Sequence, residues 1–287
     1  MRIISGSTPR SKTIHKLLQL AAVAMIAATA GAADTHKSGT WSVSSLTVDA
    51  GDRIVAHGNL LIVATGTVEI KGQIDALEGV SVQIIAPTIR IRGGISTADG
   101  FNSRGVNIAG QKAGDITLDA DTLDIAGATV QAGKGGNGGW SGDGGEGGSV
   151  YIAGCPLILM DQQTALRAGV GGNGGNGIDG YTQAEMNGGD GGDTGVIGMP
   201  CYTLSTPDPA PPCSAYQGSN GGDGGNGASP GSGGSAGSGG TGSGGSGGTG
   251  GAGGTGSGSN GNPGSNGGNG TGTNGSSGVA GSNGNLC

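Results

Sequence analysis

Short segments in which apolar and polar residues alternate recur across residues 40–200. Each repeat reads apolar–x–apolar, then a three-residue corner, then apolar–x–apolar again. Alternation with a period of two is typical of β-strands. Recurrence at a fixed spacing is typical of solenoids, in which each unit packs on its neighbours. The pattern therefore predicts short strands stacked in successive coils.

Two offsets superimpose these segments. An offset of 21 aligns Leu61–Gly79 with Val82–Gly100. An offset of 34, applied twice, aligns four apolar positions in three coils: Val82, Ile84, Ile89 and Ile91, then Ile116, Leu118, Leu123 and Ile125, then Val150, Ile152, Leu157 and Leu159. We expect an all-β solenoid over residues 40–199, a right-handed parallel β-helix of about four coils. An antiparallel sandwich of short strands is the alternative.

The N-terminal end of this region predicts a partial first coil. Leu46 and Val48 have the same alternation as the later coils, and Trp41 is placed to cap that end. The extra residues between coils fall at one corner, in Phe101–Gly114, Gly133–Gly148 and Gly171–Gly198. Because the last two carry Gly at every third position, we expect glycine-rich loops that grow from one edge of the solenoid.

The segment Gly218–Cys287 carries Gly at every third position in five runs separated by short phase slips. Three residues per turn is the repeat of the polyproline-II helix, and Gly on one edge lets a neighbouring backbone approach. We therefore expect a glycine-rich helical bundle over 214–287, after a Pro/Cys linker at 200–213. A flexible Gly/Ser linker is the alternative. Collagen is disfavoured, because it needs one unbroken register and abundant Pro.

The first 33 residues predict a signal peptide. Basic residues precede an apolar run, Leu17–Ala30, and small residues follow it at spacings suited to cleavage. The run is short for a membrane span, so an uncleaved anchor is the less favoured alternative. We expect a protein that is secreted or held in the cell envelope, extracellular or periplasmic, with no membrane span after removal of the signal.

If the protein is exported, its cysteines are expected to form disulfide bonds. Three pairings of the four cysteines are possible, and we favour Cys155–Cys201 with Cys213–Cys287. The second bridge would clamp the two ends of the glycine-rich segment, which buries little apolar surface. Zinc is a poor rival, because the cysteine spacings are wide and beyond residue 33 the two histidines, His36 and His57, look like isolated surface residues.

Composition limits the core and the partners. The 287 residues include 72 Gly but two Trp, four Tyr and one Phe, so a conventional core cannot extend over the whole chain. The formal charge is −7, and no charged side chain follows Asp223. Nucleic-acid binding needs clustered Lys and Arg, so we expect no nucleic-acid partner.

Few residues point to chemistry. The sequence lacks a Gly-x-Ser-x-Gly nucleophile motif, and its clustered carboxylates, which alternate along one coil, fit a solvated face: Asp115, Asp119, Asp121 and Asp124. We predict no enzymatic activity and no cofactor. Calcium is the alternative, because Gly174–Tyr181 fits the calcium nonapeptide and Gly188–Asp193 repeats its first six positions. The candidate ligands are Asp179, Asp190 and Asp193.

Two stretches resemble known families. Runs such as GSNGGDGGNG and GSGGTGGAGGTG resemble snow-flea antifreeze proteins and glycine-rich domains of phage tail-fibre adhesins and, more loosely, mycobacterial glycine-rich surface proteins. The stretch GDITLDADTLDIAGATVQAGKG resembles the β-helix of filamentous-haemagglutinin-type exoproteins. The first resemblance implies a disulfide-tied bundle of polyproline-II-type helices with one flat face.

These observations give three hypotheses of function. The first is an exported, non-catalytic structural or adhesive protein that contacts a cell-surface glycan or a matrix. The second is an ice-binding protein, whose flat uncharged row of hydroxyl and methyl groups would be Ser246, Thr249, Ala252 and Thr255. The third is a carbohydrate-active β-helix enzyme.

Overall fold

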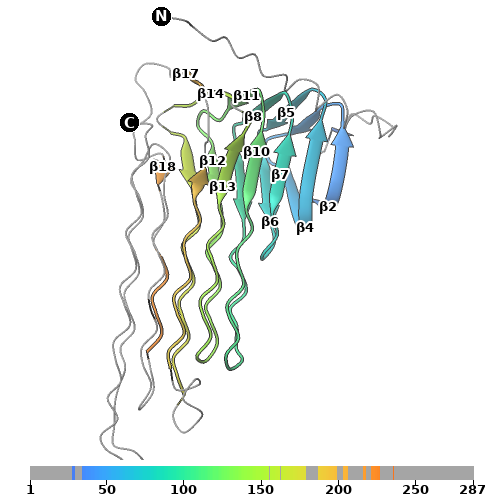
Figure 1. The fold of residues 1–287 in the computed structure, drawn as a ribbon. Helices are drawn as coiled ribbons and strands as arrows, with labels where there is room; N and C mark the ends of the chain where they lie inside the picture. Colours follow the sequence, from blue (N-terminus) through green and yellow to red (C-terminus); the bar gives the residue numbers. More distant parts are fainter. Residues whose placement is uncertain are drawn as a thin grey trace, which may run out of the picture.

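The computed structural model describes residues 28–29, 34–154, 156–161, 163–178, 187–198, 203–205, 216–217, 221–226 and 235. These residues form β-strands, turns and extended segments, and every strand pairing among them is parallel. The all-β prediction is confirmed in this form, and the antiparallel sandwich is wrong. Successive passes of the chain lie side by side (Figure 1).

The strands belong to two sheets. The seven-stranded sheet has the order β1 (Ala28–Thr29), β3 (Leu46–Val48), β5 (Thr67–Ile70), β8 (Thr88–Ile91), β11 (Thr122–Asp124), β14 (Leu157–Leu159) and β17 (Thr203–Ser205). The eleven-stranded sheet has the order β16 (Ile197–Gly198), β13 (Val150–Ala153), β10 (Ile116–Asp119), β7 (Val82–Ile85), β4 (Arg53–Ala64), β6 (Gln73–Ala76), β9 (Gly94–Thr97), β12 (Thr129–Gln131), β15 (Ala165–Arg167) and β18 (Tyr216–Gln217), and β2 (Asp34–Val43) pairs with β4.

The long strand β4 joins two rows of the larger sheet. Its first part pairs with β6 and its last part with β7, and the corner 57–59 lies between them. Strand β2 runs along β4 with a register shift between Lys37 and Gly39. Trp41 on β2 is partly buried and packs against the hydrophobic core, as expected for a residue that caps this end.

The strand register follows the offsets read from the sequence. Val68 lies opposite Ile89, and Leu46 lies opposite Val68 as the partial first coil predicts. In the next row Ile84, Leu118 and Ile152 lie opposite one another in successive turns, and all three are 0% exposed. Each such side chain contributes about 1.5–3 kcal/mol by leaving water. Because side chains alternate between faces, this burial fixes the register of the strands in these rows.

One predicted alignment is wrong by a residue. The offset of 34 placed Leu157 beside Leu123, but Leu123 lies opposite Ile158 and Leu157 lies opposite Thr122. The cause is the corner between β13 and β14, which holds one residue more than the corner between β10 and β11 and begins at Gly154 with φ +87°. A slip of one residue exchanges the two faces of a strand. Leu157 is accordingly 39% exposed, whereas Ile158 is 1% exposed.

The slip predicts different costs for two neighbouring truncations. Ile158→Ala removes buried atoms and leaves a cavity, so we expect a loss of about 2–4 kcal/mol of unfolding free energy. Leu157→Ala, the matched control on the same strand, is expected to cost less than about 1 kcal/mol. Denaturant titration followed by circular dichroism measures both. Equal losses of unfolding free energy would indicate that Leu157 is buried in the core and that the one-residue slip is wrong.

An ion pair connects two successive turns on the outer surface. Arg92 donates from Nη1 to Asp124 Oδ1 at 2.7 Å and from Nη2 to Oδ2 at 2.5 Å. The hydrogen bonds from Arg92 lower the pKa of Asp124 below its ordinary value, although partial burial opposes the shift. A carboxylate whose folded-state pKa is lowered stabilises the folded protein above its unfolded pKa of about 3.9, and this contribution is lost as the pH falls through the folded pKa.

This pair gives an acid-sensitivity prediction. Asp124→Asn is expected to lower stability at pH 7 by less than about 1 kcal/mol, because the Arg92 side chain is 42% exposed and the pair is partly screened. The difference from the parent should shrink as the pH falls from 4 towards 2, because Asp124 in the folded state is then increasingly protonated as the pH approaches its lowered pKa. Melting temperatures across this range measure the effect, with the exposed Asp121→Asn as control. An undiminished difference at low pH would contradict the assignment.

Candidate binding face on the glycine-rich excursions

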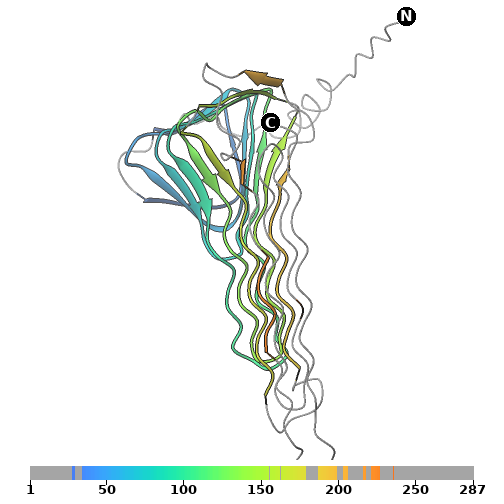
Figure 2. The same cartoon turned by 90° about the vertical axis from the view of Figure 1, so that its left-hand side faces the viewer.

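Three long segments leave the larger sheet at the same corner, as predicted. They connect β9 to β10 (98–115, excursion 1), β12 to β13 (132–149, excursion 2) and β15 to β16 (168–196, excursion 3). Earlier turns have short corners in this place, 57–59 and 77–81. Excursion 3 ends before Ile197, two residues earlier than predicted, because Ile197–Gly198 pairs with β13. The excursions project in one direction from the sheets and lie side by side (Figures 1 and 2).

The excursions bond to one another through their backbones in a repeat of three residues. The first amide of each triplet donates to the next excursion: Gly135 to Val170 O, and Gly138 to Asn173 O, both at 2.8 Å. The second donates across to a half that runs the opposite way: Gly136 donates to Gln111 O of excursion 1 at 2.8 Å, and Gly145 donates to Gly136 O within excursion 2 at 2.7 Å. Two of every three backbone N–H donors are therefore satisfied by neighbouring segments of the same chain rather than by water.

At most of these first two positions in excursion 2 there is no room for a Cβ. A Cβ added to Gly135 would lie 1.9 Å from Gly145 O, and one added to Gly136 would lie 1.9 Å from Phe101 O. Real Cβ atoms do not approach backbone oxygens so closely, so any side chain would push the layers apart. This contact explains why Gly occupies two of three positions in much of excursion 2.

The third position carries a ladder of polar side chains, which we term the Asx ladder. Asn102 Oδ1 accepts a hydrogen bond from the backbone of Asn137 at 2.7 Å, and Asn137 Oδ1 accepts one from Asn173 at 2.9 Å. Asn173 Oδ1 accepts from Asp223 N at 3.1 Å, and in a second column Asn176 Oδ1 accepts from Asn226 N at 2.8 Å. The ladder thus satisfies the third amide.

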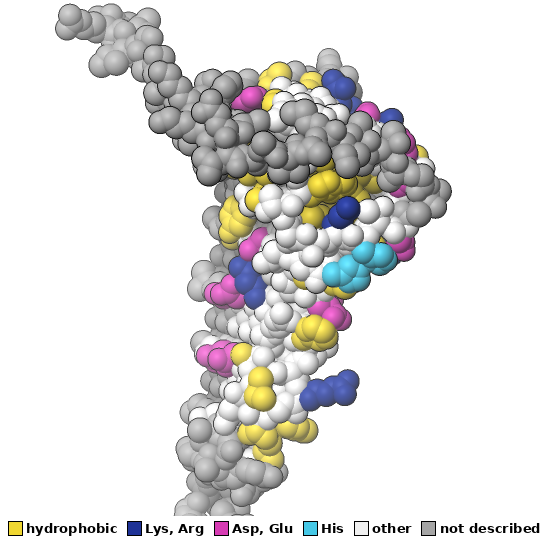
Figure 3. Space-filling model, turned by 90° about the vertical axis from the view of Figure 1, so that its right-hand side faces the viewer, with side chains coloured by type: hydrophobic (Ala, Val, Ile, Leu, Met, Phe, Trp, Pro, Cys, Tyr) yellow, Lys and Arg dark blue, Asp and Glu magenta, His cyan; other side chains and the backbone are white. Residues whose placement is uncertain are grey.

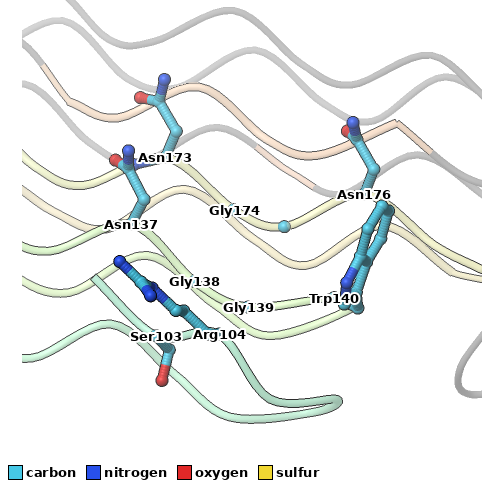
Figure 4. Close-up of a pocket in the computed structure, with 10 residues that line it drawn as sticks. Ser103, Arg104, Asn137, Gly138, Gly139, Trp140, Asn173, Gly174 and Asn176 are labelled. Atoms are coloured by element: carbon cyan, nitrogen blue, oxygen red, sulfur yellow. The ribbon is translucent and has the colours of Figure 1, made fainter.

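An open groove of about 430 Å³ crosses the outer surface of these segments (Figure 4). Glycine backbone forms its floor, Trp140 and Asn176 stand at one side, and Arg104 lies toward the other beside Asn137. Its lining residues are Ser103, Arg104, Asn137, Gly138, Gly139, Trp140, Asn173, Gly174, Gly175 and Asn176. This volume falls in the range of small-molecule sites, although the groove is shallow.

Trp140 occupies a ladder position but cannot serve the ladder. Asn137 lies beside Asn173, so three residues further on Trp140 lies beside Asn176. An indole N–H can only donate, so it cannot accept the amide hydrogen that an Asn or Asp in this place would accept. Trp140 is nevertheless 52% exposed, at the tip of excursion 2 where Ser141 turns the chain with φ +56°. Trp140 therefore neither accepts the ladder hydrogen bond nor gains stability from burial of its side chain.

Other apolar side chains are exposed on the outermost excursion. Val106 pairs with Trp140 in a parallel bridge and is 38% exposed, and Ile108 and Phe101 are more than half exposed. Hydrophobic side chains gather toward the lower end of this face, next to a basic side chain (Figure 3). Excursion 1 has no preceding excursion to cover it, so these side chains remain in contact with solvent.

The two histidines expected to be isolated are in contact. His36 Nδ1 and His57 Nε2 are hydrogen-bonded, and the ring centroids are 4.6 Å apart. The parallel pairing of β2 with β4 brings them together, and their sequence separation of 21 equals the first coil offset, which was the available signal. Across the described ranges, no group of three or more His, Cys, Asp or Glu is placed to hold a metal ion.

Most predicted site residues lie outside the described residues. These are the ice-binding row Ser246, Thr249, Ala252 and Thr255, the cysteines Cys155, Cys201, Cys213 and Cys287, and the calcium candidate Asp179. Asp190 and Asp193 lie on the returning half of excursion 3, where Asp190 Oδ1 accepts from Ser235 N at 2.6 Å. Asp190 therefore belongs to the Asx ladder, and calcium binding stays a prediction.

Comparison with known proteins gives little. No family model matches the chain, and no curated protein matches it. A crystal structure of a springtail antifreeze protein from Granisotoma rainieri, described as a bundle of nine polyproline type II helices whose crystal waters match the ice lattice, is 24% identical. The alignment covers 64% of this chain and 93% of that one, with a TM-score of 0.23, too low to bear on the fold. No helix in the part of the chain that the structure describes is long and apolar enough to cross a membrane.

The glycine contacts give a paired test. Gly145→Ala would bring a Cβ within 2.2 Å of Gln111 O, so we expect a loss of about 1–3 kcal/mol or more and a lower melting temperature. Gly58→Ala is the control, because its Cβ would meet Ser38 Cβ at an ordinary 3.4 Å, and its expected cost is below about 1 kcal/mol. Comparable melting temperatures for the two variants would show that the excursions are not packed backbone to backbone.

Proposed function

We propose that the chain is an exported, non-catalytic protein that acts by surface contact, of the structural or adhesive kind. In this proposal a right-handed parallel β-helix carries a bundle of polyproline-II-type glycine helices, which continues through residues 214–287. The offset of 34 that relates β7, β10 and β13 and the excursions from a single corner support this architecture. The signal peptide and the two disulfides belong to the same proposal, since an exported chain with so small a core gains from covalent closure.

The observation that carries the proposal is the stiffness of the excursion face. Two of three amides bond to neighbouring backbones and the third bonds to the Asx ladder, so the backbone and the ladder side chains have fixed positions. A face that is already ordered loses little conformational entropy when it binds. A broad, rigid and mostly uncharged surface suits contact with an extended partner such as a glycan or a matrix.

The groove supports contact rather than bond cleavage. Its ten lining residues include no carboxylate, histidine or cysteine, the groups that most often transfer protons or attack a substrate. Two of the four clustered carboxylates of the β region have structural partners instead: Asp124 bonds to Arg92, and Asp115 Oδ1 accepts from Ser149 N at 2.8 Å. These partners support the non-enzymatic hypothesis over the carbohydrate-active enzyme.

The test uses the full chain produced with export. We expect saturable binding to glycan-coated or matrix-coated surfaces, no product from polysaccharides incubated with the protein, and no thermal hysteresis. Gly145→Ala should weaken surface binding because it separates the layers, whereas the exposed Asp121→Asn should leave it unchanged. Release of cleaved sugar would overturn the proposal, and ice shaping without binding to glycan or matrix would replace it with the ice-binding hypothesis.

A further inference from the structure

We propose that the groove beside Trp140 binds an acidic saccharide, with a sugar ring stacked on the indole and a carboxylate paired with Arg104. This inference rests on the proposed function and names the class of ligand that the surface contacts. It draws on the form of the groove, the position of Trp140, the orientation of three amides and the charge of Arg104.

Trp140 supplies the apolar platform. The axial C–H groups of a pyranose form a flat apolar patch that packs on an aromatic ring, and tryptophan offers the largest such ring with a polar N–H at its edge. Trp140 is half exposed, and its place in the Asx ladder costs a hydrogen bond that Asn would make. A stacked ligand ring would cover the exposed indole and give it the burial that it lacks in this structure.

The ladder amides supply oriented donors. Asn137, Asn173 and Asn176 each accept a backbone hydrogen bond at Oδ1, which fixes the plane of the amide. Each amide then has its two N–H donors to offer a ligand. The three groups stand on the same side of the ribbon, around the glycine floor (Figure 4). Sugar hydroxyls are the partners such donors suit, and donors held in place bind at low entropic cost.

Arg104 supplies the charge and the preference for an acid. It is the one charged residue of the groove lining, and it makes no ion pair with any residue that the structure describes. A guanidinium binds a carboxylate through two parallel hydrogen bonds. The net charge of −7 opposes an acidic ligand, but screening over about 8 Å at physiological salt lets the nearby Arg104 dominate.

The shape favours a unit within a longer glycan. The groove is shallow and open, with Gly138, Gly139 and Gly174 beneath it, so no side chain blocks a ring that lies flat. It lies near the tips of excursions 1 and 2, away from the sheets, where a large partner can reach it. A small free metabolite would instead suit an enclosed cavity.

The chain holds two tryptophans, which allows a direct measurement. In a full-length Trp41→Phe background, Trp140 is the only tryptophan and its emission reports the groove. The probes are a galacturonate tetramer and sialyllactose, with a galactose tetramer and lactose as neutral counterparts. We expect acidic probes to shift and quench the emission saturably, and to bind at least about tenfold more tightly than their neutral counterparts.

Variants in the full-length chain separate the two contacts, with binding measured by calorimetry. Arg104→Ala should reduce acidic-probe affinity to that of the neutral probe, and Trp140→Ala should weaken both by at least about tenfold. Trp140→Phe keeps a smaller ring and should retain part of the affinity. Phe101→Ala, exposed outside the groove lining, is the control and should bind like the parent. Melting temperatures within a few degrees of the parent establish that each variant is folded.

The outcomes separate this inference from the proposed function. Unchanged binding in Trp140→Ala, equal affinity for acidic and neutral probes, or no response of Trp140 emission would each overturn the saccharide site. If the parent still adheres to glycan or matrix surfaces in that case, the proposed function stands and the contact lies elsewhere. Saccharide binding by the parent without adhesion to any surface would instead overturn the adhesive function and leave the groove assignment in place.

Discussion

The structure depends on one contact, the approach of one peptide backbone to another with no Cβ between them. In the β region, backbones approach one another closely only between hydrogen-bonded strands of the same sheet, and apolar side chains fill the space between opposite sides of the coil. In the excursions the same close spacing occurs in two directions, because Gly145 bonds to Gly136 across the layers while Gly135 bonds to Val170 within one. In the excursions, backbone hydrogen bonds hold neighbouring layers together, a task that buried Ile and Leu side chains perform in the β region. The excursions therefore form a slab with almost no hydrophobic core.

Much of this could be read from the sequence, because both regions follow a strict period. The offsets of 21 and 34 matched strands such as β5 with β8 and β7 with β10 to the residue, since alternating burial allows a single register. The spacing of Gly predicted extended segments at one corner. The Asx ladder could not be predicted from the spacing of Gly, because its role depends on which neighbouring amide each side-chain carbonyl meets, and that is set by the stacking of whole turns.

Features that depend on a single residue could not be read in this way. The extra residue at the corner that begins at Gly154 exchanged Leu157 for Ile158 in the core, and an alignment of apolar residues accepts either. The importance of Trp140 arises only when its ladder neighbours are known, because an exposed tryptophan in a glycine-rich run has no pattern of its own. The separation of 21 between His36 and His57 was a signal of their contact, but using it also required the pairing of β2 with β4, which joins the end cap to the first coil.

One corner of the coil is short at 57–59 and 77–81 and long in the three excursions. The packing of the core and the length of the projection are therefore set by different parts of the chain. The strands on either side keep their register whatever the corner contains, so the β region is insensitive to its length. A triplet added to the outgoing half and one added to the returning half would advance the tip by one repeat and keep the existing triplets in register. Reach can therefore change in discrete steps by insertion alone, and a lineage could tune how far the tip extends without altering a single core residue.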